Sequence, residues 1–171
     1  MTKFLTIFCI LALIGLATLE WNALLPAINL FCLLLAKISG FFIHLFDDNM
    51  ILIDRVMRHG THGFALEVAD DCSGLSASWL LLAAIVAFDS SWKQKLWGIL
   101  IGILVLQAIN IFRLITLFYI GDWMPEYFDF AHKQVWIVLI NISMIVIFGS
   151  WLYYIITHQA RPARFPKPSR S

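Results

Sequence analysis

Apolar residues run along this chain in five long blocks, and short polar stretches separate the blocks. The blocks cover roughly residues 4–20, 24–46, 73–89, 96–120 and 133–157. Crossing a hydrocarbon core ~30 Å thick takes about 20 helical residues, and several of the blocks reach that length. The pattern therefore predicts an all-α integral membrane helix bundle of about five transmembrane helices, which form a single membrane domain over residues 1–157.

Residues 50–71 show a different pattern, in which apolar and β-branched residues alternate with polar ones. Two glycines, Gly60 and Gly63, stand between the two alternating stretches and suit a tight turn. We therefore expect a short outward-facing β-hairpin within residues 47–71, immediately before Cys72. Its two arms would be formed by Ile51, Ile53 and Val56 and by Phe64, Leu66 and Val68.

Composition supports the membrane class and excludes several others. Hydrophobic residues make up 61% of the chain and charged residues 13%, whereas soluble domains average roughly 45–50% and about 25%. A net charge of +1 gives no reason to expect nucleic acid as a partner. The cysteines, at positions 9, 32 and 72, are too far apart for a metal knuckle, and no glycine-rich phosphate loop is present. We expect no metal and no cofactor.

Basic residues gather in two places, residues 93–95 and residues 161–170. The positive-inside rule places both in the cytoplasm, which predicts a multi-pass protein of the cytoplasmic (inner) membrane. Residues 47–72 and 121–132 then face outward together, on the extracytoplasmic side. The basic, proline-rich residues 158–171 are expected to form a disordered cytoplasmic tail that is drawn to anionic headgroups of the lipid bilayer.

Cys72 follows the expected hairpin and precedes the third apolar block, which predicts a position at or near the first turn of a helix. Unpaired N–H groups and the helix dipole favour an anion there, and therefore the nucleophilic thiolate. Asp70 and Asp71 oppose that effect, although either side chain could cap the helix. Taken alone, Cys72 fits a small buried residue at a helix start equally well.

Arg113 lies inside the fourth apolar block, about seven residues before its outer end. An arginine at membrane depth costs about 2.5–3.5 kcal/mol on insertion scales and is by default a functional-site candidate. Asn110 stands one helical turn earlier on nearly the same face. The alternative is an arginine that snorkels to the outer headgroups.

His132 ends the outward segment 121–132 and stands at the start of the fifth helix, on the same side of the membrane as Cys72. A lone histidine there would usually be an interfacial residue. A catalytic role is favoured because three reactive groups, a thiol, a guanidinium and an imidazole, all fall toward the outward ends of three consecutive helices. The three residues Cys72, Arg113 and His132 are therefore the predicted catalytic groups.

The other polar residues give weaker indications of a functional site. His59 and His62 have the spacing of a metal-binding pair but lack a third ligand, and we expect an exposed polar turn. His44 has no partner that would make it a haem ligand. Three acidic residues near His132 are interpreted as a solvated loop, although they could orient the imidazole or bind substrate: Asp122, Glu126 and Asp129.

Taken together, the motif CSGL starting at Cys72, the motif NIFR ending at Arg113 and the following His132 resemble the exosortase/archaeosortase signature, in both order and spacing. The resemblance covers roughly residues 50–157 and is to the short exosortases, of the exosortase H type. It implies a catalytic triad of Cys72, Arg113 and His132, with supporting positions at Asn110, Ser73 and Gly74.

The resemblance implies a membrane-embedded cysteine transpeptidase. Its substrates would be exported proteins that end in a PEP-CTERM-like sorting signal, which consists of a short motif, a transmembrane helix and a basic cluster. The enzyme would cleave near the outer membrane face and transfer the new C-terminus to an unknown acceptor molecule. Two other interpretations stay open: a non-catalytic assembly or cofactor subunit whose Arg113 pairs with an acid of another chain, and a small-solute carrier that uses Arg113 and Asn110.

Overall fold

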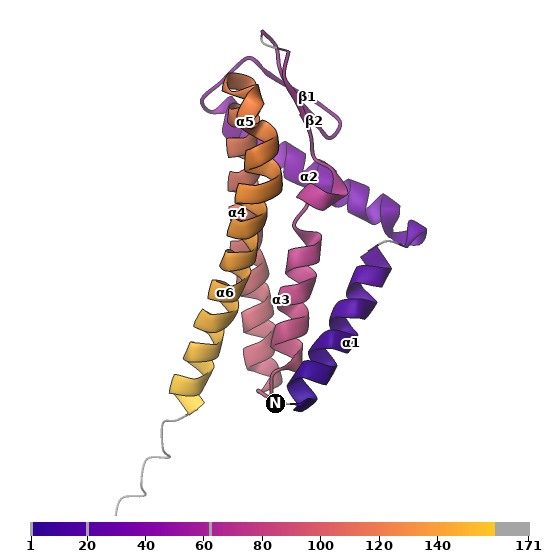
Figure 1. Cartoon of the computed structure of the whole chain (residues 1–171), viewed down its shortest axis with the longest axis vertical. Coiled ribbons are helices and arrows are strands. Elements are labelled where there is room, and N and C mark those ends of the chain that lie inside the picture. Colours follow the sequence, from indigo (N-terminus) through magenta and orange to yellow (C-terminus); the bar gives the residue numbers. More distant parts are fainter. Residues whose placement is uncertain (1, 20, 62, 160–171) are drawn as a thin grey trace, which may run out of the picture.

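The computed structural model describes residues 2–19, 21–61 and 63–159, so His62 and the basic tail from residue 160 lie outside the described residues. Six α-helices occur in the described part of the chain: α1 (Thr2–Leu19), α2 (Leu25–His44), α3 (Leu75–Ala87), α4 (Trp92–Trp123), α5 (Pro125–Phe130) and α6 (Trp136–Gln159). Three short helical turns complete the described helical structure: η1 (Asn22–Leu24) between α1 and α2, η2 (Asp70–Cys72) before α3, and η3 (Ala131–Val135) between α5 and α6. Helices α1, α3, α4 and α6 run along the length of the molecule, while α2 lies obliquely across one end (Figure 1).

Among the described residues, four helical stretches are long and apolar enough to cross a membrane, namely α1, η1 with α2, α4, and the run from α5 to residue 157. Helix α3 is also apolar but has 13 residues, which span about 20 Å at ~1.5 Å per residue. Large apolar side chains such as Leu13, Leu104 and Ile145 are exposed, as expected for helices that face lipid rather than water. The protein is therefore a helical membrane protein. The expected number of five crossings stays a prediction.

Helix α1 is attached to the bundle through α3. The indole Nε1 of Trp79 donates a hydrogen bond to the backbone oxygen of Leu11 at 2.9 Å. Gly15 gives the Trp79 ring its space, because a Cβ at position 15 would overlap that ring. An indole that satisfies its N–H on a neighbouring helix fixes two apolar helices side by side without exposing a polar group to lipid.

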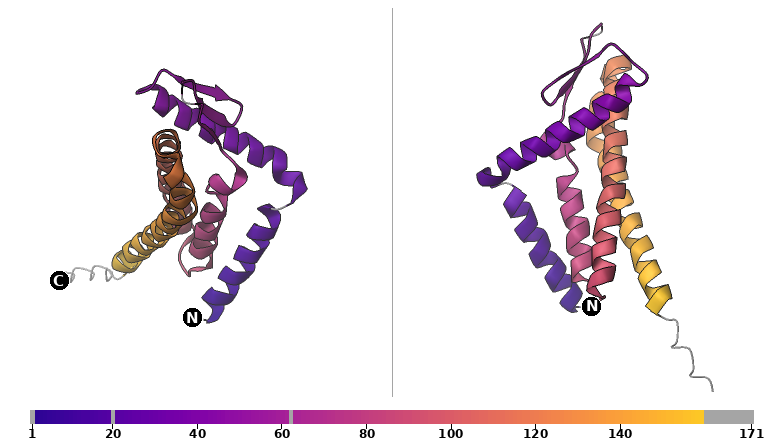
Figure 2. Two further views of the ribbon diagram at one scale, coloured as in Figure 1. Left: turned by 45° about the horizontal axis from the view of Figure 1, so that its top comes forward. Right: turned by 180° about the vertical axis from the view of Figure 1, so that it is seen from behind.

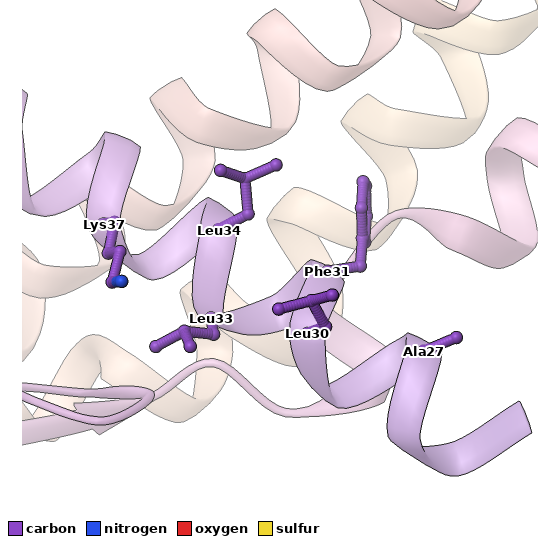
Figure 3. Close-up of a pocket in the computed structure, with 6 residues that line it drawn as sticks. All are labelled: Ala27, Leu30, Phe31, Leu33, Leu34 and Lys37. Atoms are coloured by element: carbon purple, nitrogen blue, oxygen red, sulfur yellow. The ribbon is translucent and has the colours of Figure 1, made fainter.

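Helix α2 crosses the bundle at an angle in each view (Figures 1 and 2). One of its faces packs on α4 and on the strands that follow it. An apolar pocket of about 470 Å³ lies along α2 itself (Figure 3), lined by Ala27, Leu30, Phe31, Leu33, Leu34 and Lys37. None of the three predicted catalytic residues lines this pocket.

The segment before Cys72 forms a small antiparallel sheet of three strands within the described residues, where the sequence predicted a two-armed hairpin. The strands are β1 (Met50–Ile53), β2 (Val56–His59) and β3 (Ala65–Glu67), in the order β1-β2-β3. The predicted first arm is divided by a turn at Asp54, whose φ of 53° is left-handed and suits an aspartate. The expected glycine-containing turn joins β2 to β3.

Residues 121–132, predicted to be a loop, are helical apart from a break at Met124. Helix α4 continues to Trp123, and α5 begins at Pro125, where a proline loses no hydrogen bond because the first helical N–H has no intrahelical partner. From Pro125 to Gln159 the chain is one helical run through η3. The three predicted side chains therefore lie on helical elements and not on a long loop.

The core is densest at the end of the bundle that carries the sheet. Buried residues of α2, the sheet, η2, α4 and η3 form one apolar cluster there, and Cys72 belongs to it. A smaller cluster of Leu81, Ile85 and Leu106 joins α3 to α4 farther along the bundle. The region around Cys72 is thus enclosed by packed elements on several sides.

Candidate active site

Cys72 is the last residue of the turn η2, which precedes α3. Its N–H donates to the oxygen of Ala69 at 2.9 Å. The N-cap of α3 is Gly74, in the left-handed region with φ 69°, and not Asp70 or Asp71. Cys72 therefore lies near the first turn of α3, two residues before its N-cap.

Ser73 fixes the shape of this turn. Its hydroxyl donates to the oxygen of Asp70 at 2.6 Å and accepts a hydrogen bond from the N–H of Leu75 at 3.2 Å. A serine that bonds backbone groups on both sides competes with regular helix and favours a turn. The motif CSGL thus holds Cys72 in a turn directly before α3.

His132 lies beside the thiol, with its Nε2 3.0 Å from the Cys72 sulfur. Cys72 itself is only 3% exposed. A nucleophile and a base at this separation meet the geometric requirement for proton transfer between them. The pair comes from elements 60 residues apart in the sequence, so only the fold brings it together.

The backbone around His132 is unusual. Residues 131–135 form a π turn between α5 and α6, where the sequence predicted the beginning of an ordinary helix. One additional residue in a turn rotates the side chains on its two sides by about 100° relative to a regular helix. Such π turns occur frequently at functional sites, and here the turn carries the imidazole that faces Cys72.

Arg113 points inward, toward the same sulfur. The residue is 5% exposed, and its Nη2 donates to the Cys72 sulfur at 3.9 Å. Its Nε has no hydrogen-bond partner among the described residues. The alternative of an arginine snorkelling to the headgroups does not fit this orientation.

Asn110 holds the backbone of the cysteine. Its side chain is fully buried, and its Nδ2 donates to the carbonyl oxygen of Cys72 at 3.1 Å. The neighbouring Gln107 donates to the hydroxyl of Ser78 at 3.0 Å, which ties α4 to α3. Gly74 suits its left-handed φ, and a Cβ at position 74 would stand only 3.2 Å from the Asn110 amide, a tight contact.

His59 is buried, at 6% exposure, so the expected exposed polar turn at this position is wrong. Its Nε2 lies 3.2 Å from a carboxylate oxygen of Asp47, and its Nδ1 lies 3.7 Å from Asp122. No cluster of three or more metal-ligating side chains occurs among the described residues. The contacts join the sheet to the segment after α2 and to the end of α4, and no spacing in the sequence indicates them.

Arg55 is a second residue that the sequence did not single out. It donates to the Asn29 side chain at 2.9 Å and forms ion pairs with Glu67 at 3.2 Å and Asp70 at 3.5 Å. The four side chains line a polar pocket of about 300 Å³ together with Ala69. Because Asp70 begins the turn that ends at Cys72, this network also supports the position of the thiol.

Two of the three acidic residues near His132 are exposed. They are Asp129, which forms an ion pair with Lys133 at 3.2 Å, and Glu126.

Cys72, His132 and Arg113 thus meet among the helices of a membrane protein. A family model described as "Transmembrane exosortase (Exosortase_EpsH)" matches residues 2–149. The chain therefore belongs to the transmembrane exosortase family. The match includes α1 and α2, which lie before the range of the motif resemblance. No curated protein and no solved structure matched the chain.

Membership indicates a sorting role at the membrane, because this family is in general one of cysteine transpeptidases. Such an enzyme needs a thiol nucleophile, a proton carrier and a group that stabilises the oxyanion. The described residues contain each of these chemical groups within 4 Å of one sulfur atom.

Proposed function

We propose that this protein is a membrane-embedded cysteine transpeptidase that cleaves the C-terminal sorting signal of exported proteins and transfers the new C-terminus to an acceptor. The observation that carries the proposal is the convergence on the Cys72 sulfur, with His132 Nε2 at 3.0 Å and Arg113 Nη2 at 3.9 Å. These groups come from three separate elements, η2, η3 and α4.

The first half of the reaction forms an acyl-enzyme. The Cys72 thiolate attacks the scissile carbonyl carbon, a sulfur–carbon bond forms, and the carbonyl π electrons move onto oxygen. Arg113 stabilises this oxyanion through its buried guanidinium, an effect worth about 2.7–4 kcal/mol per donor in a water-poor site. The carbon–nitrogen bond then breaks, and the imidazolium of His132 gives its proton to the leaving amine.

The second half transfers the acyl group. An acceptor nucleophile loses its proton to the neutral imidazole of His132 and attacks the thioester carbon. The new bond forms as the sulfur–carbon bond breaks, which regenerates the thiolate. Burial of Cys72, at 3% exposure, keeps water from the thioester and so favours transfer over hydrolysis.

The proposed substrates are exported proteins whose signal contains a short motif, a transmembrane helix and a basic cluster. A site among membrane helices suits a scissile bond that is anchored next to its own transmembrane helix. Lys93 and Lys95 begin α4 at the end of the bundle away from the sheet (Figure 1). The positive-inside rule therefore supports a cytoplasmic membrane location with Cys72 toward the extracytoplasmic side.

The proposal is tested by co-expressing the protein with reporters that carry candidate C-terminal sorting signals and measuring reporter cleavage in isolated membranes. We expect cleavage by the intact protein and none by Cys72→Ala inserted at the same level. Cys9→Ala is the matched control, because Cys9 is an exposed cysteine on α1 and its removal should leave cleavage unchanged. Equal cleavage by the intact protein and Cys72→Ala would reject Cys72 as the nucleophile and would favour the interpretation as a non-catalytic subunit.

A further inference from the structure

The imidazole of His132 packs against an aromatic ring from its own helical run. The centroids of the Phe128 and His132 rings are 5.6 Å apart, with 32° between the ring planes. The two residues are four apart, on either side of the junction between α5 and the π turn η3. Phe128 thus borders the imidazole that faces Cys72.

Phe128 is in turn held by Phe64, the residue immediately before strand β3. Phe64 packs edge-on against Phe128, with centroids 5.5 Å apart and 63° between the rings, and it packs against Phe118 of α4 at 6.2 Å. Edge-to-face pairs at these distances are favourable. The oxygen of Phe64 accepts a hydrogen bond from the N–H of His59 at 2.9 Å, which fixes this residue to β2.

Gly121 provides the space that Phe64 occupies. A Cβ at position 121 would overlap the Phe64 ring, so this position of α4 must be glycine for the ring to lie here. The contacts form a continuous path from the connection between β2 and β3, through Phe64 and Phe128, to the imidazole. The path packs against the same apolar cluster that contains Cys72.

We propose that Phe128, supported by Phe64, is a positioning residue that holds the His132 imidazole against the Cys72 thiol. The inference rests on the proposed function, because it concerns the same Cys72 and His132 pair. A histidine side chain has two rotatable bonds, and the Nε2 to sulfur distance of 3.0 Å is kept only in one orientation. The Phe128 ring restricts that orientation, and a displacement near 1 Å reduces catalysis by about a hundredfold in other enzymes.

The test measures the rate at which iodoacetamide alkylates Cys72 at neutral pH in the purified full-length protein, quantified by mass spectrometry on the peptide that contains Cys72. This readout needs no substrate. The imidazole favours the thiolate, so His132→Ala should react more slowly than the intact protein. Phe128→Ala should slow alkylation toward the rate of His132→Ala, and Phe128→Tyr, which keeps the ring, should restore the intact rate.

Phe130→Ala is the matched control, because Phe130 lies on the same short helix and is 55% exposed; its rate should equal that of the intact protein. Should Phe128→Ala fail to insert, Phe64→Leu tests the same path and should slow alkylation in the same direction. Alkylation of an inserted Phe128→Ala protein at the intact rate, with His132→Ala slow, overturns the positioning role alone. If His132→Ala also reacts at the intact rate, the Cys72 and His132 pair of the proposed function fails, and this inference fails with it.

Discussion

At the scale of single residues, Arg113 is the group whose environment is hardest to explain without chemistry. It lies within an apolar helix, is 5% exposed, and has an Nε without a partner among the described residues. A structural arginine at this depth would be expected to satisfy its donors on carbonyl or carboxylate oxygens. An unused donor beside a thiol fits a group that bonds an oxyanion only when substrate is bound.

Replacement of Arg113 by lysine keeps the positive charge but removes the planar, forked donor. We expect Arg113→Lys to reduce reporter cleavage by about a hundredfold, the typical effect of losing one oxyanion donor. Cleavage rates in membranes, normalised to the amount of inserted protein, measure this effect. An unchanged rate would show that charge alone suffices and that Arg113 is not a geometrically defined donor.

The conformation of Gly74 leads to a prediction about thermal stability. An alanine at this position would adopt a left-handed φ of 69° and approach the Asn110 amide at 3.2 Å. Since a left-handed conformation costs about 1–2 kcal/mol for a residue with a Cβ, Gly74→Ala should lower the temperature at which the detergent-solubilised protein unfolds. Gly149→Ala is the matched control, because no atom lies within 4 Å of its added Cβ. Equal unfolding temperatures for the two variants would contradict the role assigned to Gly74.

At the scale of secondary structure, periodicity predicted the helices well and their junctions poorly. The apolar blocks correspond to α1, α2, α3, α4 and α6. Long helices that face lipid are rich in apolar residues, and this composition can be recognised in the sequence. The division of the first sheet arm at Asp54 and the helical form of residues 121–132 were not predicted. Both depend on short polar segments, where a turn, a helix and a loop have similar local preferences.

The buried contacts of His59 connect three elements, and their removal should loosen the sheet. His59→Leu would leave the carboxylates of Asp47 and Asp122 without the imidazole that lies 3.2 and 3.7 Å away. Leaving a buried polar group without its partner typically costs about 1–3 kcal/mol. We expect faster hydrogen exchange in the strands β1 and β2, measured by mass spectrometry. His44→Leu, at an exposed position, is the control, and similar exchange in both variants would contradict a structural role of His59.

At the scale of the whole molecule, the sequence predicted which residues form the candidate site but not how they are held. Arg113 was identified because a charged group inside an apolar helix stands out, and Cys72 and His132 because they fall toward the same outward helix ends within the resemblance to the exosortase signature. The π turn under His132 and the aromatic contacts of Phe128 were not identified, since Phe and Trp in an apolar chain have no distinctive spacing. Tertiary contacts between distant elements decide those features.

Orientation in the membrane is a further property of the whole chain that can be tested. A cysteine introduced at Ser91, in a protein without its native cysteines, should react with a membrane-impermeant maleimide only after the membrane is opened. A cysteine at Asp54, in the turn between β1 and β2, should react in intact cells. The positive-inside rule places Lys93 and Lys95, and with them Ser91, in the cytoplasm. The sheet lies at the other end of the bundle (Figure 1) and therefore on the outer side. The reverse labelling pattern would place Cys72 on the cytoplasmic side and contradict a role in processing exported proteins.

The central claim is that Cys72 forms a covalent bond with the substrate, and the most direct measurement is to isolate that intermediate. A cleavable reporter would be incubated with membranes that contain the protein, denatured in acid, and analysed by mass spectrometry on the peptide that carries Cys72. We predict that the N-terminal reporter fragment is attached to Cys72 through a bond that hydroxylamine breaks. Cleavage of the reporter at full rate by Cys72→Ala would contradict the claim.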